Sequence, residues 1–291
     1  MQNDLVVSCI RGSWCSIDHI RYYAKSLSVS GFAGRKMMFV DQMPEETRNF
    51  LKGFGFELVD FTVEGINDTN FLAQGRFVAM LDFLKDHYQD FRYIVWTDVG
   101  DVVFQTDPSV WLDLHLGSSR IAAATECWRI RDEGFNNSCL RDALSDADFE
   151  QIRHHEALCC GTLAGTSELI YKVFLDVYTY VRDTMVRKGR FNNYSPIDQA
   201  VLNYFLRQSP YKEVTSIPRM AEGFTATCSV FRGNGFHSHI NFDRNNQTDD
   251  TPIFDKNSGT IFTPDGKTPF SIVHQYNRDG EWKAIIEKKY Q

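Results

Sequence analysis

The sequence contains no apolar run long enough to cross a membrane, no Cys-x-x-Cys pair, and no internal repeat or low-complexity tract. The missing apolar run argues against a membrane-spanning protein. Without a Cys-x-x-Cys pair, a zinc ribbon or a dithiol redox centre is not expected, and seven cysteines favour a reducing compartment over a disulfide framework. No signal-peptide pattern opens the chain, so we expect a soluble, cytoplasmic protein.

The overall charge of the chain is slightly acidic. Its 31 Lys and Arg side chains stand against 38 Asp and Glu side chains, which gives a formal net charge of −7. A chain of this charge has no broad attraction for nucleic acid or anionic membranes. We therefore expect no nucleic-acid partner, and any anionic ligand must be held by a local group of side chains.

Apolar runs and helical periodicities alternate along the first half of the chain. Expected strands cover residues 5–10, 37–40, 56–61, 93–96 and 121–125, and expected helices cover 16–30, 77–88 and 108–114. This alternation predicts an α/β protein with a mainly parallel sheet and helices on both faces.

The second half of the chain is less regular. Residues 127–144 show no clear periodicity and are expected to form a functional loop. Ser145 is expected to open a polar helix that carries His154 and His155, and the segment at 158–165 is expected to bend at two glycines. Two further helices are expected, one at 166–188 that Gly189 stops and one at 195–206 that begins with a capping box from Ser195. Short strands and loops should follow and end in a strand at 270–274. We expect one domain over residues 1–291 with an elaborated C-terminal third.

Two aspartates, Asp98 and Asp101, interrupt otherwise apolar sequence, with Gly100 between them. Positions three apart in a strand face opposite sides, so both carboxylates can reach one site only through a turn, which Gly100 permits. A divalent cation such as Mg²⁺ or Mn²⁺ would compensate the two charges, and the end of strand 93–96 is where parallel sheets bind ligands. The alternative is a turn in which Asp98 caps backbone amides.

The segment Trp96-Thr-Asp-Val-Gly-Asp-Val-Val-Phe-Gln-Thr-Asp-Pro108 resembles the metal-binding motif of GT-A-type glycosyltransferases, which use nucleotide-diphosphate sugars. That motif usually reads Asp-x-Asp, whereas this chain has Asp-x-x-Asp. The resemblance implies a GT-A-like, Rossmann-type fold and a Mn²⁺ or Mg²⁺ cofactor. It makes Asp101 a metal ligand and Asp98 either a second ligand or a partner of the nucleotide ribose. His274, in Ile272-Val-His-Gln-Tyr-Asn-Arg278, is similar to the histidine that completes the metal site in this family.

The same resemblance implies four basic residues for the donor. Arg11 and Arg76 are placed like residues that meet the base and diphosphate, and Arg278 and Lys283 like residues that steady the leaving diphosphate. Arginine suits this role because its planar fork donates two parallel hydrogen bonds. The alternative for each residue alone is a solvated surface cation.

On the acceptor side, Cys160-Gly-Thr-Leu-Ala-Gly165 resembles the segment beneath the transferred sugar, which implicates Gly161 and Thr162; its alternative is tight packing against the following helix. Asp198 and Gln199 resemble an Asp-Gln pair near the acceptor. Asp198 is the candidate base that deprotonates the acceptor hydroxyl in an inverting reaction, or an acid in a capping box. Trp128 is a candidate for stacking on base or sugar, or for the core.

The resemblance therefore implies transfer of a sugar from a nucleotide-diphosphate donor, with a UDP-sugar expected, to a hydroxyl of a glycan acceptor. Residues 1–125 would form the nucleotide-binding part and residues 126–291 the acceptor-side part. A narrower likeness is to the soluble glycan-building transferases of chloroviruses, including a xylosyltransferase, which would make UDP-xylose the donor. The alternatives are a metal-dependent hydrolase of sugar nucleotides or phosphate esters, and a non-catalytic sugar- or nucleotide-binding module.

Overall fold

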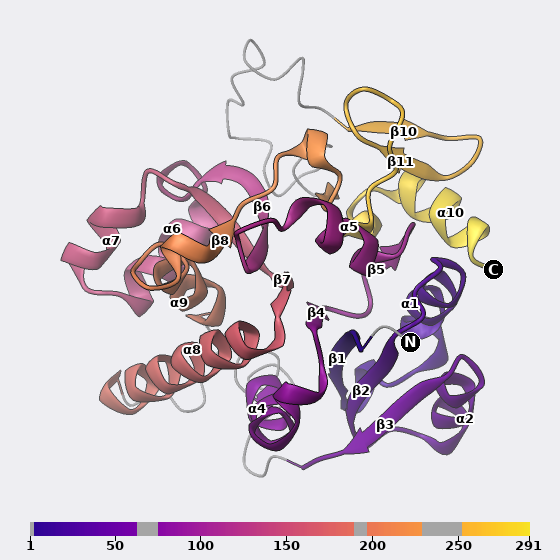
Figure 1. Ribbon diagram of the computed structural model, residues 1–291, viewed down its shortest axis with the longest axis horizontal. Helices are drawn as coiled ribbons and strands as arrows, with labels where there is room; N and C mark the ends of the chain where they lie inside the picture. The colour runs from indigo at the N-terminus through magenta and orange to yellow at the C-terminus, as the bar shows by residue number, and fades with distance from the viewer. Residues whose placement is uncertain (1–2, 63–74, 189–196, 229–251) are drawn as a thin grey trace.

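A mostly parallel sheet forms the centre of the protein (Figure 1). The computed structural model describes residues 3–62, 75–188, 197–228 and 252–291. In this part of the chain the sheet has seven strands in the order β3-β2-β1-β4-β7-β6-β8. The strands are β1 (Leu5–Arg11), β2 (Arg35–Asp41), β3 (Phe56–Asp60), β4 (Tyr93–Thr97), β6 (Ile121–Arg129), β7 (Glu156–Thr166) and β8 (Thr215–Ser216). Only β7 runs against its neighbours, β4 and β6, so the predicted fold class is confirmed.

Helices cover both faces of this sheet (Figure 1). The first face carries α1 (Ile17–Val29), α2 (Glu45–Gly53) and α5 (Pro108–His115), and the second carries α4 (Arg76–His87), α6 (Gly134–Ala143), α7 (Asp146–Ile152), α8 (Ser167–Lys188) and α9 (Ile197–Phe205). Because side chains alternate along a strand, Val6 packs with the helices of the first face, whereas Leu5 and Val7 pack with those of the second. Asp107 caps α5 by accepting a hydrogen bond from the Ser109 amide.

A smaller sheet begins with the strand after β4 and packs beside α1. Its order is β5-β12-β9, with β5 (Val102–Phe104) antiparallel to β12 (Ile272–His274) and β9 (Thr225–Thr227) parallel to it. A separate apolar cluster joins these strands to helix α10 (Gly280–Lys289) and to the hairpin of β10 (Ile253–Asp255) and β11 (Thr260–Phe262). This sheet positions His274, the last residue of β12.

Two expectations for the second half were wrong. Residues 127–144 are not a loop, because β6 continues to Arg129 and α6 follows. The carboxylate of Glu133 accepts hydrogen bonds from the Phe135 and Asn136 amides and so begins α6, whose buried face includes a polar residue that hides the helical pattern. Helix α7 begins after Ser145 as expected but ends at Ile152, so it does not carry His154 or His155.

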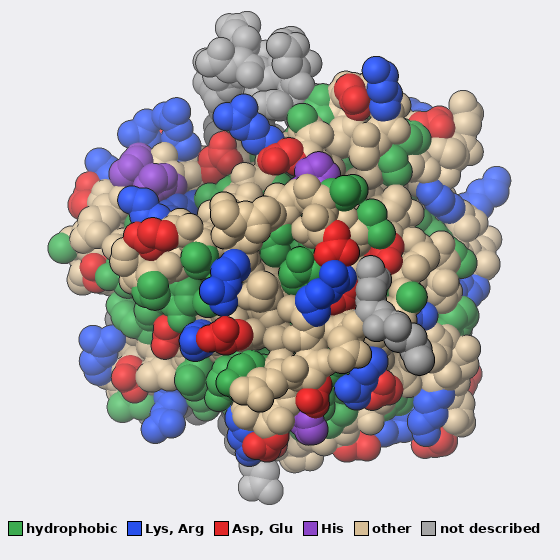
Figure 2. Space-filling model, in the orientation of Figure 1, with side chains coloured by type: hydrophobic (Ala, Val, Ile, Leu, Met, Phe, Trp, Pro, Cys, Tyr) green, Lys and Arg blue, Asp and Glu red, His purple; other side chains and the backbone are tan. Residues whose placement is uncertain are grey.

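Other differences are smaller. Segment 158–165 belongs to the unbroken strand β7, and helices α2 and α10 were not expected. The expected stop at Gly189 and the capping box at Ser195 lie outside the described residues. Among the described helices, none is both long and apolar enough to cross a lipid bilayer. On the face drawn in Figure 2, basic and acidic side chains are interspersed, so this face presents no broad patch of one charge.

Candidate metal centre and substrate pocket

Strand pairing brings Asp98, Asp101 and His274 together from distant parts of the chain. Strand β4 ends at Thr97, and the turn that follows holds both aspartates before β5 begins. Strand β12 pairs with β5 so that His274 lies opposite Val102. The amide of the next residue, Gln275, then donates to the Asp101 carbonyl at 2.8 Å. His274 therefore lies beside the turn because of the register between two short strands.

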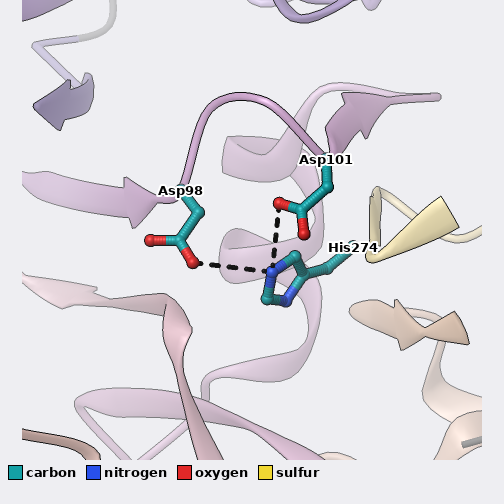
Figure 3. Close-up of side chains that lie close together, drawn as sticks. All are labelled: Asp98, Asp101 and His274. Carbon is teal, nitrogen blue, oxygen red and sulfur yellow. Dashed lines mark ion pairs between the residues drawn. The ribbon is translucent and has the colours of Figure 1, made fainter. Parts of the chain in front are cut away.

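The three side chains form a cluster of metal-ligand type (Figure 3). The His274 Nε2 atom lies 3.6 Å from Asp98 Oδ2 and 3.5 Å from Asp101 Oδ1. All three ligand atoms lie within 4.8 Å of one another. Two carboxylates and one imidazole fit Mn²⁺, which accepts both ligand types, and His274 is buried. The predicted trio thus has the chemistry and spacing of a divalent-cation site.

Two glycines allow this close approach. A Cβ atom on Gly161, in β7, would lie 2.5 Å from Asp98 Oδ2 and 2.5 Å from His274 Cε1. A Cβ atom on Gly100 would lie 2.0 Å from the ring of His19, which comes from α1. The backbone of Gly100 is not in the left-handed region, so Gly100 serves the turn by leaving space for His19.

Arg76 is a buried cation that links two carboxylates. Its Nη1 donates to Asp98 Oδ1 at 2.9 Å, and its Nη2 donates to Asp198 Oδ2 and to Cys160 Sγ, the latter at 3.0 Å. The guanidinium also lies over the Trp96 ring at 5.7 Å from its centroid. Asp98 is therefore held from one side by Arg76 and from the other by His274.

The charges in this cluster shift each other's pKa values. Burial alone would raise the pKa of Asp98, but the hydrogen bond with His274 and the charge of Arg76 outweigh burial and lower the pKa to about 2. Burial opposes the charged form of His274, whereas Cys159 and the carboxylates of Asp101 and Asp98 raise its pKa above the usual value. Asp98 is thus ionised across the physiological range.

A pocket of about 430 Å³ opens beside the cluster. It lies where β6 and β7 separate, because their pairing shifts register between Ala123 and Thr125 and again before Arg129. Besides the cluster, the lining includes residues from β1 and the segment after it, from α1, α4, α6 and α9, from the turn, from β6 and β7, and from the segment after β12: Cys9, Trp14, His19, Arg76, Gly100, Glu126, Phe135, Cys160, Gly161, Asp198, Gln199, Gln275, Asn277 and Arg278. Metal ligands and a cavity large enough for a small molecule therefore share one site.

Several predicted residues meet in this pocket. Asp198 lies on α9, is buried, and has its pKa raised by burial, while the charge of Arg76 lowers it. Gln199 accepts a hydrogen bond from the Cys160 amide at 3.2 Å. Arg278 is largely exposed at the rim, with its Nη2 3.8 Å from Asp101 Oδ2. Thr162 is fully buried in β7, next to Gly161, and does not line the cavity.

Three predicted residues lie apart from the pocket. Arg11, at the end of β1, forms an ion pair with Asp41, whose Oδ2 lies 3.0 Å from Arg11 Nε. Lys283 lies half-exposed on α10, with Nζ 3.9 Å from Glu287 Oε1. Trp128 is buried in β6. None of the three lines the cavity, and their roles remain predictions.

The structure adds residues that the sequence did not suggest. Glu126 lines the cavity, and it lies in a hydrogen-bond network with Asn136, Glu133 and Gln199. Cys159 Sγ lies 3.5 Å from the His274 Nδ1 atom, the side of the ring away from the carboxylates. No motif in the sequence marked this group.

Comparisons with known proteins agree with this architecture. No family model matches the chain, and a search of curated proteins found no match. Among solved structures, galactosyltransferase LgtC in complex with donor and acceptor sugar analogues is similar, at 14% identity with a TM-score of 0.55 over 98% of this chain and 95% of that one. An active-site mutant of LgtC is similar at 13% identity, with the same TM-score and coverage. The chain therefore has an LgtC-like GT-A fold.

Proposed function

We propose that this protein is a glycosyltransferase that moves a sugar from a nucleotide-diphosphate donor to a hydroxyl of a glycan acceptor. The observation that carries the proposal is the Asp98, Asp101 and His274 cluster, which opens into a cavity of about 430 Å³ at the carboxyl end of β4. The fold shared with a galactosyltransferase supports it. A UDP-sugar is the proposed donor class; UDP-xylose and a viral glycan pathway rest on the sequence resemblance alone.

On the donor side, Asp101, His274 and Asp98 would hold Mn²⁺ or Mg²⁺. A bound divalent cation neutralises charge that develops on a leaving diphosphate. Arg278, exposed beside Asp101, is proposed to bind the diphosphate oxygens. We further propose that residues 1–125 supply most of the nucleotide-binding part and residues 126–291 the acceptor-side part.

On the acceptor side, Asp198 is proposed as the base of an inverting transfer. Its carboxylate lines the cavity, and burial raises its pKa, which favours acceptance of a proton from a hydroxyl. As the acceptor oxygen bonds to the sugar carbon, the bond from that carbon to the diphosphate breaks, and the hydroxyl proton passes to Asp198. Arg76, which contacts Asp198, would keep the carboxylate in place.

The first test is a thermal-shift titration with UDP, GDP and CDP, each with and without Mn²⁺. A ligand that binds only the folded protein raises the melting temperature, so a nucleotide and Mn²⁺ together should stabilise the wild type. Asp101→Ala should remove this stabilisation, whereas Asp82→Ala, an exposed control on α4, should retain it. If no nucleotide stabilises the wild type with Mn²⁺ present, the proposal is wrong.

Radiolabelled nucleotide sugars then separate the alternatives. A transferase forms labelled glycoside when a sugar acceptor is present. A hydrolase releases free sugar at a rate that no acceptor changes, and a binding module leaves the donor intact.

A further inference from the structure

Glu126 is directed into the pocket by an irregular part of β6. The strand leaves its regular pairing with β7 between Thr125 and Arg129. Within this interval Cys127 has a φ of 57°, which is rare for a residue other than glycine, and its amide donates to Thr125 Oγ1 at 2.9 Å. The bulge turns the strand away from its partner, and Glu126 lines the cavity that results.

Two amide side chains fix the Glu126 carboxylate. Asn136 Nδ2 donates to Oε2 at 2.8 Å, and Gln199 Nε2 donates to Oε1 at 3.3 Å. These two amides also contact each other, with Gln199 Nε2 2.8 Å from Asn136 Oδ1. Gln199 is further held by the Cys160 amide. The carboxylate is thus held in one orientation before any ligand binds.

Glu126 differs from the other carboxylates of the pocket in its partners. Asp98 and Asp198 share the Arg76 guanidinium, and Asp101 lies near Arg278. In the described ranges of the chain, no Lys or Arg forms an ion pair with Glu126. A carboxylate has about four lone-pair sites, and the two amides use two of them. Glu126 therefore retains acceptor capacity toward the cavity.

The charge of Glu126 restricts which ligand it can contact. A carboxylate whose hydrogen-bond partners are neutral amides repels phosphate oxygens, so the nucleotide diphosphate is a poor partner. Hydroxyl groups are good partners, because an O–H donor to a carboxylate makes a charge-assisted hydrogen bond. Glu126 comes from β6, which β7 separates from β4 and its metal-ligand turn. This placement leaves the metal-ligand side for the diphosphate.

We propose that Glu126 binds a hydroxyl of the acceptor sugar and thereby positions it for transfer. This inference rests on the proposed glycosyltransferase function and adds a residue that selects the acceptor. Glu126 forms no covalent bond in this role and takes no proton. It accepts a hydrogen bond from an acceptor hydroxyl, while Asn136 and Gln199 keep its carboxylate facing the cavity.

The test compares wild type with Glu126→Gln, which keeps the shape of the side chain and removes its charge. The probes are UDP with Mn²⁺, radiolabelled UDP-glucose, UDP-galactose and UDP-xylose, and a panel of methyl hexosides and pentosides as acceptors. Glu126→Gln should raise the acceptor KM by about tenfold or more. The Kd for UDP with Mn²⁺ and the hydrolysis of donor by water should change less than about twofold.

Glu168→Gln is the control, because Glu168 is an exposed carboxylate on α8 that pairs with Lys172 and does not line the cavity. It should leave the acceptor KM unchanged. If Glu126→Gln does not fold, Glu126→Asp, which keeps the charge but withdraws it from the cavity, should raise the acceptor KM in the same way.

Three results would overturn the inference. They are an acceptor KM unchanged in Glu126→Gln, an equal rise in Glu168→Gln, and a wild type that consumes donor yet binds no methyl glycoside by saturation-transfer NMR in the presence of UDP and Mn²⁺. Failure of the proposed function would look different, because the wild type would then neither bind UDP with Mn²⁺ nor consume any donor.

Discussion

Gly161 sets the distance between β7 and the metal-ligand side chains. Its backbone carbonyl accepts a hydrogen bond from the Asp98 amide at 2.9 Å, so the strand cannot easily move away from the turn. A side chain at this position would occupy the space that the Asp98 carboxylate and the His274 ring now fill. A substitution at Gly161 therefore tests whether that space is needed for metal binding.

Gly161→Ala should therefore weaken Mn²⁺ binding by at least about tenfold and cost about 1–3 kcal/mol of stability, because the added methyl overpacks the site. Isothermal titration with Mn²⁺ and urea unfolding measure the two effects. Gly53→Ala is the control, because a Cβ atom there has no neighbour within 4 Å. Equal Mn²⁺ affinity in both variants would show that Gly161 does not limit the cluster.

Arg76 is the residue whose loss should destabilise the site most. Removing it leaves Asp98 and Asp198 without their shared cation, and breaking a buried pair costs about 3–5 kcal/mol. Arg76→Ala should show a loss of this size in urea unfolding. Arg35→Ala, which breaks an exposed pair with Glu57, should cost less than about 1 kcal/mol. Similar losses of stability in the two variants would show that burial does not make the ion pairs of Arg76 more important than the exposed pair of Arg35.

The sequence predicted the metal-ligand residues better than the rest of the pocket. Asp98 and Asp101 stand out because ionisable residues in an apolar run are unusual, and the local turn could be inferred from their spacing. Glu126 and Asn136 give no such signal. They come together through a bulge in β6 and a helix whose start depends on the Glu133 side chain, and neither feature follows from periodicity.

At the scale of elements, the pairing of β5 with β12 decides whether the site is complete. Because side chains alternate along a strand, a shift of one residue would turn His274 away from Asp101. The alternation of strands and helices in the first half was predictable from apolar runs. Helix α10 was not, since the sequence after His274 has few apolar residues and its start depends on the Asp279 cap.

Helix α6 offers a test of capping at this scale. Glu133→Ala removes a helix cap, worth about 1 kcal/mol, and a partner of the buried Asn136 side chain, worth about 1 kcal/mol more. Ser145→Ala removes only the cap of α7 and should cost about 1 kcal/mol. Chemical denaturation of both variants compares the losses. A Ser145→Ala loss equal to that of Glu133→Ala would contradict the additional role of Glu133.

At the scale of the whole molecule, the candidate metal centre lies between the central sheet and a smaller sheet, one face of which packs in an apolar cluster of its own. Asp98 follows a strand of the central sheet, whereas His274 ends a strand whose core includes Val273, Val103 and Trp282. The geometry of the cluster therefore depends on packing that lies outside the pocket.

Trp282→Ala should cost about 3–5 kcal/mol and also weaken Mn²⁺ binding, although Trp282 does not line the pocket. Phe149→Ala, which opens a cavity in the core of the central sheet, should cost a similar amount and leave Mn²⁺ binding unchanged. Urea unfolding and Mn²⁺ titration measure both. Unchanged Mn²⁺ affinity in Trp282→Ala would show that the smaller sheet holds His274 without this support.

The pairing of β5 with β12 also fixes an order of assembly during protein synthesis. The ribosome makes both aspartates well before His274, so a growing chain carries its carboxylates before the imidazole that completes the cluster. A chain that has not yet reached β12 has no strand to pair with β5 at this position. The complete three-residue cluster can therefore form only after synthesis has passed His274.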